Sequence, residues 1–189
     1  KKTLGMQVVL LPSTSTVIQG DGSNLTDDED NELIGTSGND RIEGSANPFG
    51  RFDDGYDILE GGAGDDVLIG GPIGTSRPVS DLYRFESGSG NDVIIGFSPT
   101  ADYVDKFYSG DQIIDRIEIT KDINGSGIAS SQDVLDRATE NDDGWVVLNL
   151  GGDNSVLLDG VKKSDLLLRN IHVLPSTSTV IQGDGSNLT

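Results

Sequence analysis

Residues 61–69 read GGAGDDVLI, and this nine-residue stretch decides the fold class. Its glycine-rich half turns the chain through backbone angles that only glycine adopts cheaply. Its second half has the form D-x-U-x, where U is a large apolar residue, and it predicts a very short strand with one inward side chain. Here Asp66 stands at the junction of turn and strand, and Leu68 is the inward residue.

Further copies of the pattern flank this stretch. Clear copies begin at positions 35, 52 and 87, and degenerate copies begin at positions 17, 26 and 76. Their aspartate and apolar pairs are Asp40 with Ile42, Asp57 with Leu59, Asp81 with Tyr83, and Asp92 with Ile94. Because two such units make one coil, the series predicts an all-β fold, a right-handed parallel β-roll.

The units alternate between two sides of the predicted roll. The first side stacks turns 35–40, 61–66 and 87–92, and the second side stacks turns 26–31, 52–57 and 76–81. Extra residues at 45–51 and 72–78 lead into the second side, where Pro78 also occupies a glycine position. We therefore expect bulges on the second side and firmer cation sites on the first side.

Carboxylates next to turn carbonyls indicate calcium, which takes about six to eight oxygen ligands. In a roll the ions would lie between turns stacked on the same side, and we expect about three to six of them. The predicted ligands in the repeats are Gly35, Ser37, Asp40, Asp57, Gly61, Gly62, Ala63, Gly64, Asp66, Asp81, Gly88, Gly90 and Asp92.

A second calcium candidate follows the repeats. Residues 122–133, DINGSGIASSQD, match an EF-hand-like loop in which an acid takes the twelfth place. Its predicted ligands are Asp122, Asn124, Ser126, Ile128 and Asp133. The alternative is a polar loop that caps a short helix, with Ser130 or Ser131 as the N-cap.

Composition excludes several function classes. The net charge of −19 disfavours nucleic acid and anionic lipid as partners, and no run of apolar residues is long enough to span a membrane. The chain lacks cysteine, and His172 is its only histidine, in an apparent strand. Since no catalytic motif appears, we expect no enzyme activity from this chain.

An identical 16-residue segment, LPSTSTVIQGDGSNLT, occupies residues 11–26 and 174–189. We infer one period of a tandem array, and the alternative is an artificial overlap. The predicted division is 1–16 as the tail of a preceding unit and linker, 17–97 as the roll, 98–173 as the C-terminal strands, loop and hairpin, and 174–189 as the start of the next unit.

The repeat series resembles the RTX (repeats-in-toxin) hemolysin-type calcium-binding family. Residues 81–97 resemble the family's exit coil, and 145–161 resemble its capping hairpin, with a turn at 151–154. In the strand-like segment 111–119, the resemblance makes Asp115 a further ligand. It implies a C-terminal β-hairpin cap with one or two short helices, calcium-dependent folding, and type I secretion to the surface or surroundings of a bacterium.

These observations favour a structural or adhesive module of an extracellular bacterial repeat protein. Neighbouring copies of the module are the expected partners, in the same chain or by head-to-tail assembly. Nothing in the sequence supports carbohydrate binding, because the basic residues are few and scattered. The alternative is an accessory module of a secreted protease, lipase or polysaccharide epimerase.

Overall fold

The computed structural model describes residues 15–19, 32–44, 56–70, 80–99 and 114–175, with the backbone alone for 15–19. The predicted turn at 26–31, the expected bulges at 45–51 and 72–78, and most of the C-terminal copy lie outside these ranges. Within them, no helix has the length and apolar character needed to cross a membrane.

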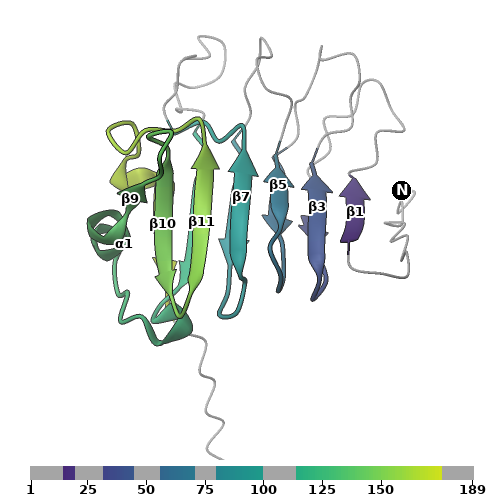
Figure 1. Ribbon diagram of the computed structural model, residues 1–189, viewed down its shortest axis with the longest axis horizontal. Coiled ribbons are helices and arrows are strands. Elements are labelled where there is room, and N and C mark those ends of the chain that lie inside the picture. The colour runs from purple at the N-terminus through teal and green to yellow at the C-terminus, as the bar shows by residue number, and fades with distance from the viewer. Residues whose placement is uncertain (1–14, 20–31, 45–55, 71–79, 100–113, 176–189) are drawn as a thin grey trace, which may run out of the picture.

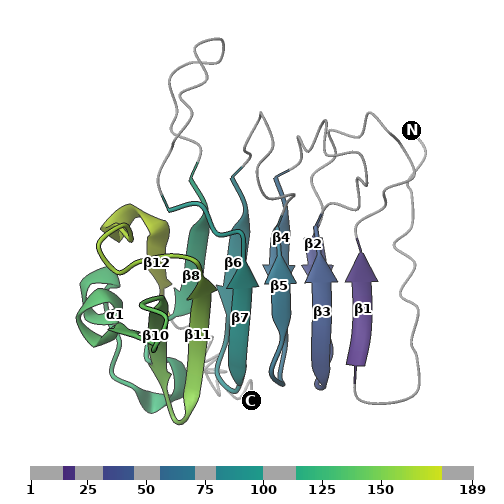
Figure 2. The same ribbon diagram turned by 45° about the horizontal axis from the view of Figure 1, so that its top comes forward.

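Two sheets face each other across the molecule (Figures 1 and 2). The first, sheet A, runs in the order β1 (Ser15–Gln19), β3 (Asn39–Glu43), β5 (Val67–Ile69), β7 (Asn91–Ile95), β11 (Asn154–Asp159), β10 (Val146–Gly151) and β9 (Thr139–Glu140). The second, sheet B, runs in the order β12 (Ile171–Leu174), β8 (Arg116–Thr120), β6 (Leu82–Phe85), β4 (Ile58–Glu60) and β2 (Glu32–Ile34).

From β2 to β8 the chain alternates between the two sheets, one strand at a time. Neighbouring strands of this part of each sheet are therefore parallel, because the chain visits the opposite sheet between them. This arrangement confirms the predicted all-β parallel β-roll.

The core consists of two columns of inward side chains that the strand register aligns. In sheet B the column is Leu33, Leu59, Tyr83, Ile117 and Ile171. In sheet A it is Ile42, Leu68, Ile94 and Leu158. Every one of these side chains is at most 1% exposed. Each strand of these columns thus contributes one inward apolar side chain to the core, so a complete coil contributes two.

The C-terminal end carries the predicted hairpin and helix. Strands β10 and β11 pair antiparallel, and β11 pairs parallel with β7, so the hairpin extends sheet A beyond the last coil. Its turn uses positive φ angles at Gly151, Gly152 and Asp153. Helix α1 (Ser131–Arg137) has Ser130 as its N-cap, the first of the two predicted candidates. Two 3-10 helices, η1 (Ile123–Gly125) and η2 (Leu168–Asn170), complete the cap.

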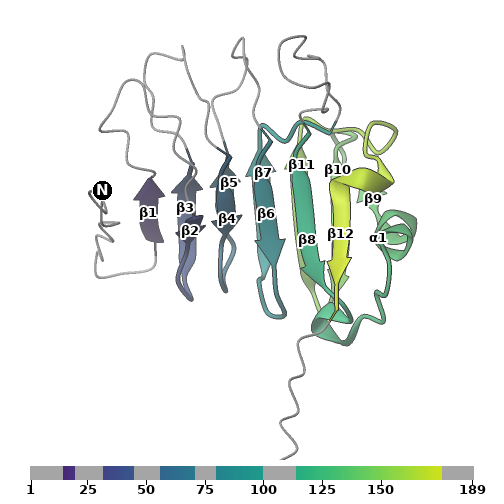
Figure 3. The same ribbon diagram turned by 180° about the vertical axis from the view of Figure 1, so that it is seen from behind.

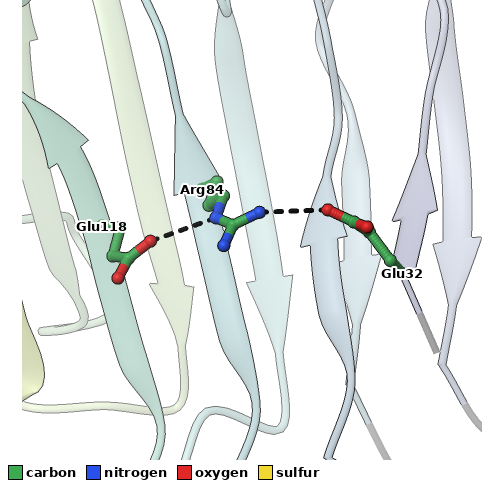
Figure 4. Close-up of polar contacts among 3 residues, drawn as sticks. All are labelled: Glu32, Arg84 and Glu118. Atoms are coloured by element: carbon green, nitrogen blue, oxygen red, sulfur yellow. Dashed lines mark hydrogen bonds and ion pairs between the residues drawn. The ribbon is translucent and has the colours of Figure 1, made fainter. Parts of the chain in front are cut away.

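On the outer face of sheet B, Arg84 joins three strands. Its Nε donates to Glu118 on β8 and its Nη1 to Glu32 on β2, both at 3.1 Å (Figure 4). The second contact reaches across β4, which lies between β6 and β2. The Glu32 side chain is 57% exposed, so solvent screening limits what this pair contributes.

We expect Arg84→Met to lower the free energy of unfolding by about 0.5–1 kcal/mol, because the exposed ion pairs are lost while the aliphatic stem is kept. Urea denaturation at saturating calcium measures this change. Arg41→Met is the matched control, since Arg41 pairs only locally with Glu43, and it should change stability by less than about 0.5 kcal/mol. Equal losses in the two variants would contradict a role for Arg84 in joining the coils.

Candidate metal centre

Buried aspartates join successive coils on the first side. The Asp40 N–H donates to Asp66 Oδ1 at 2.7 Å, and the Asp66 N–H donates to Asp92 Oδ1 at 2.9 Å. All three residues are at most 4% exposed. Each bond connects residues 26 positions apart, so it spans one complete coil of the roll. The structure thus brings together the three first-side aspartates that the sequence aligned.

The second carboxylate oxygen of two of these residues has no partner. Asp66 Oδ2 and Asp92 Oδ2 are buried and make no hydrogen bond of ordinary geometry. The same holds for the Ser89 hydroxyl, which nevertheless lies close enough to Asp92 to counter part of the rise that burial causes in the pKa of that carboxyl. An unpaired buried carboxylate oxygen is costly, because it has lost its hydration without gaining a replacement. The folded chain therefore presents inward oxygen ligands that a cation could use.

Glycines make the space around these oxygens. A Cβ at Gly35 would lie 1.9 Å from the Gly61 carbonyl oxygen and 2.9 Å from Asp40 Oδ2. A Cβ at Gly61 would lie 2.2 Å from Asp66 Oδ2, and one at Gly62 would lie 2.1 Å from the Thr36 carbonyl oxygen. Stacked turns therefore place carbonyl and carboxylate oxygens where any side chain would collide, which is a donor set suited to calcium.

The remaining first-side predictions lie on the same stacked turns. The Ala63 N–H donates to the Thr36 carbonyl oxygen at 3.1 Å. A Cβ at Gly64 would meet the Gly38 backbone, and one at Gly90 would meet the Gly64 carbonyl oxygen, so these turns are also in close contact. Ser37 is exposed, and Gly88 has open space around it.

A second ladder runs along the exposed rim of the same turns. The Asp65 N–H donates to Asn39 Oδ1 at 3.0 Å, and the Asn91 N–H donates to Asp65 Oδ1 at 2.9 Å. Its direction is opposite to that of the buried ladder, because here the later coil donates to the earlier one. Asp65 and the adjacent Asp66 therefore each form hydrogen bonds with both the preceding and the following coil.

On the second side the described aspartates are Asp57, Asp81 and Asp115. The Asp57 N–H donates to Asp81 Oδ1 at 3.1 Å, and the Asp81 N–H donates to Asp115 Oδ1 at 3.0 Å. Asp115 Oδ2 accepts a further bond from the Ser98 N–H at 2.7 Å. Both oxygens of Asp115 are thus already hydrogen bonded, in contrast to those of Asp66 and Asp92. Asp115 remains a predicted ligand, with less unused capacity.

Two asparagines end the stack of first-side turns. Asn124 Oδ1 accepts from the Gly88 N–H and Asn154 Oδ1 accepts from the Gly90 N–H, both at 2.7 Å. Both amides therefore take the place that a following coil would occupy. The next position in the buried column is Val156, which pairs with Asp92. Neutral and apolar groups thus end the carboxylate series at this end of the roll.

The EF-hand-like loop has its predicted atoms in other bonds. Asn124 Oδ1 is bonded to Gly88, and the Ile128 carbonyl oxygen accepts from the Asp122 N–H at 2.7 Å. Asp133 Oδ2 accepts from Ala129, Ser130 and the Ser130 hydroxyl, as part of the capping box of α1. Asp122 Oδ1 accepts from Gly127, and Ser126 Oγ accepts from Ile128. The helix-capping interpretation therefore has direct geometric support, and calcium binding here remains a prediction.

Burial changes the acidity of the unpaired carboxyls. Desolvation by burial raises the pKa of Asp66 to about 6 and that of Asp92 to about 7. It also raises the pKa of Asp115 to about 6, against the hydrogen bonds from Asp81 and Ser98. The charged forms that bind a cation are therefore disfavoured in the metal-free fold, and a cation would stabilise them.

Among the described residues, no three His, Cys, Asp or Glu side chains gather as a metal cluster. Such a cluster is not expected in this fold, because each turn offers only one buried carboxylate and the other oxygen ligands would be backbone carbonyls. The sequence did not indicate Ser89 or Thr36 as site residues. Ser89 offers a hydroxyl at a variable position of the repeat, and Thr36 offers a backbone carbonyl oxygen, which every residue type has. The orphaned oxygens and the glycine-shaped space around them fit calcium.

The comparisons with known proteins agree with this geometry. Residues 25–47 and 53–72 match the model of the RTX calcium-binding nonapeptide repeat in 4 copies. These segments are RTX repeats. They bind calcium in the proteins that carry them, and the resemblance noted from the sequence is thereby confirmed. No curated protein matches the chain.

Two solved structures are similar to this chain. The extracellular lipase of Serratia marcescens is 22% identical with a TM-score of 0.46, over 78% of this chain and 20% of the lipase chain. A subunit of the mannuronan C5-epimerase of Azotobacter vinelandii is 25% identical with a TM-score of 0.43, over 85% of this chain and 87% of that one. The chain therefore spans one fifth of the lipase, and similarity at this level identifies neither an activity nor a substrate.

We expect Gly35→Ala to destabilise the calcium-loaded chain by about 1–3 kcal/mol more than Gly88→Ala. The added methyl of the first variant collides with the Gly61 carbonyl oxygen, whereas the second has open space and only the strain of φ +87°. Denaturation at saturating calcium, with the calcium midpoint measured in parallel, tests both. Equal effects would mean that the space at Gly35 is not part of a cation site.

We expect the fraction of metal-free chain that is folded to fall as pH rises through about 6–7, because Asp66 and Asp92 lose in that range the protons that the metal-free fold holds; circular dichroism in calcium-free buffer measures this fraction. The sign follows from linkage. Their folded pKa values exceed the unfolded value of about 3.9, so the metal-free fold holds extra protons and loses stability as pH rises from about 4 to about 7. A metal-free circular dichroism signal that stays constant from about pH 5 to about pH 8 would contradict this assignment.

Proposed function

We propose that the chain is a calcium-dependent folding module of an extracellular bacterial repeat protein, with a structural or adhesive role through end-to-end stacking of units. The observation that carries the proposal is the pair of buried oxygens on Asp66 and Asp92 that make no hydrogen bond of ordinary geometry, and Asp66 lies in a segment that matches the RTX repeat. These oxygens make the metal-free fold costly and the calcium-bound fold favourable.

Net charge supports the same coupling. The chain carries 32 acidic and 13 basic residues, for a charge of −19, and only 34% of its residues are hydrophobic. Without cations the aligned carboxylates repel one another, and one apolar residue per strand offsets little of the chain entropy. Binding of calcium between coils supplies the missing free energy, so the free energy of binding becomes free energy of folding.

A threshold near extracellular calcium levels would make folding depend on the compartment. Extracellular calcium modules bind with dissociation constants of about 10⁻⁴–10⁻³ M. At the low calcium concentration of a cytosol the chain would stay unfolded, and outside the cell it would fold. RTX repeats are typical of secreted proteins, which supports an extracellular location. Export by a type I system and display at the cell surface are the finer parts of the proposal.

The identical segments at 11–26 and 174–189 favour a repeat array over an accessory module of an enzyme. In such an array, calcium between the coils would stiffen each unit, and stacked units would cover one another's strand edges. The role of the module itself is then mechanical, and its carboxylates serve the metal rather than acid–base chemistry.

We expect calcium to convert the chain from a largely unfolded state into a compact, β-rich one, seen by circular dichroism and light scattering across a titration. Asp92→Asn should raise the calcium midpoint at least about tenfold, equal to about 1.4 kcal/mol. The asparagine can still accept from the Asp66 N–H, but its charge is gone and its amide nitrogen can donate where a cation would bind.

Asp143→Asn is the control, because it removes the same charge from an exposed turn before β10. It should leave the midpoint within about twofold of the original. A wild-type chain whose spectrum does not respond to calcium would overturn the proposed function. Equal midpoint shifts in the two variants would leave only a general charge effect and contradict a first-side site.

A further inference from the structure

Strand β1 covers the N-terminal edge of sheet A. It pairs parallel with β3 over five positions, from Ser15 opposite Asn39 to Gln19 opposite Glu43. Ile18 takes the position beside Ile42, whose side chain is fully buried, and Thr16 takes the position beside Asp40. Without β1, β3 would be an edge strand with unpaired backbone groups and a buried core residue at its margin.

The five residues of β1 occur a second time in the chain. Residues 178–182 read STVIQ, as do residues 15–19, and the flanking positions from 174 to 189 are also identical to 11–26. Backbone pairing and register depend on sequence, so a segment with this sequence can form the same five pairs with β3. The chain therefore contains this strand sequence twice, and the edge of β3 pairs with the first copy.

The chain after β12 is too short for residues 178–182 to pair with β3 of the same module. Strand β12, which ends at Leu174, lies four inter-strand steps from β2, or about 19 Å at about 4.8 Å per step. Strand β1 lies at that same far end, beyond β3 (Figure 3). From Leu174 to position 178, a fully extended chain covers at most about 14 Å. Residues 178–182 cannot reach their own β3 edge while β12 stays in sheet B.

We propose that residues 178–182 form the first strand of sheet A on a second copy of this module, in the register Ser178 opposite Asn39 to Gln182 opposite Glu43. The inference rests on the proposed function, because β3 is presented only by a folded roll. It assigns the junction of the array: β12 ends one unit, and three residues later the same chain begins the sheet of the next unit.

This junction has a defined geometry. The donating strand leaves at the β12 end of one module, and the accepting edge lies at the opposite end of the next, so the contact is head-to-tail and does not close on itself. With only residues 175–177 between the paired strands, consecutive modules abut rather than hang on a flexible tether. Pro175 adds further stiffness to this short link.

The chain has no cysteine, so cross-linking can test the register directly. One acceptor chain carries Arg41→Cys with Ile18→Asp, which weakens its own β1, and a second acceptor carries Arg41→Cys alone. The donor chain carries Val180→Cys, because Val180 corresponds to Val17, the register partner of Arg41. Acceptor and donor are mixed at saturating calcium with a short bismaleimide, and circular dichroism of each chain is recorded first.

We expect both acceptors to give a cross-linked pair of chains. The yield should be at least about tenfold higher with the Ile18→Asp acceptor, because its own β1 no longer competes for the edge of β3. Adding Ile181→Asp to the donor should reduce the product at least about tenfold, because a charge would take the position beside buried Ile42. Folded acceptors that give no product above the Ile181→Asp donor would overturn the inference. A wild-type chain that never folds in calcium would instead overturn the proposed function, and the two failures are thus distinguishable.

Discussion

The structure depends on the contact between one coil and the next, where a buried aspartate accepts the backbone N–H of the aspartate before it. Asp66 and Asp92 each use one carboxylate oxygen in this way and leave the other buried without a partner. The hydrogen bond aligns the coils, and burial of the second carboxylate oxygen raises the free energy of the metal-free fold. The same residues therefore position the roll and make its stability depend on a cation.

The thin core explains why such a dependence can control folding. Each coil contributes one fully buried apolar side chain per strand at most sheet positions, such as Leu59 and Leu68, and the rest of the coil is turn. A core of this kind leaves a small margin over chain entropy. Glycine at positions such as Gly35 and Gly61 lets the turns stack at backbone distance, which brings the oxygen ligands together at the cost of further apolar contacts.

The two ends of the roll differ in a way that gives the module a direction. At the C-terminal end the aspartate series stops at Val156, and the amides of Asn124 and Asn154 cover the last first-side turn. At the N-terminal end the edge of β3 accepts a strand whose sequence recurs after β12. One end is thus closed by neutral groups, and the other is completed by a short peptide strand.

The sequence by itself determined the coil, because the nine-residue period puts glycine, aspartate and an apolar residue at positions that only a roll can use together. It also predicted the hairpin turn and the N-cap of α1, since both depend on local residue preferences. Only the tertiary structure decided which carboxylate oxygens are left without an ordinary hydrogen bond, because this depends on contacts between residues 26 positions apart. It also buried the Ser89 hydroxyl near Asp92. The fold also placed Asn124 Oδ1 in a long-range bond from the Gly88 N–H, which the local resemblance of its loop to a calcium site does not predict.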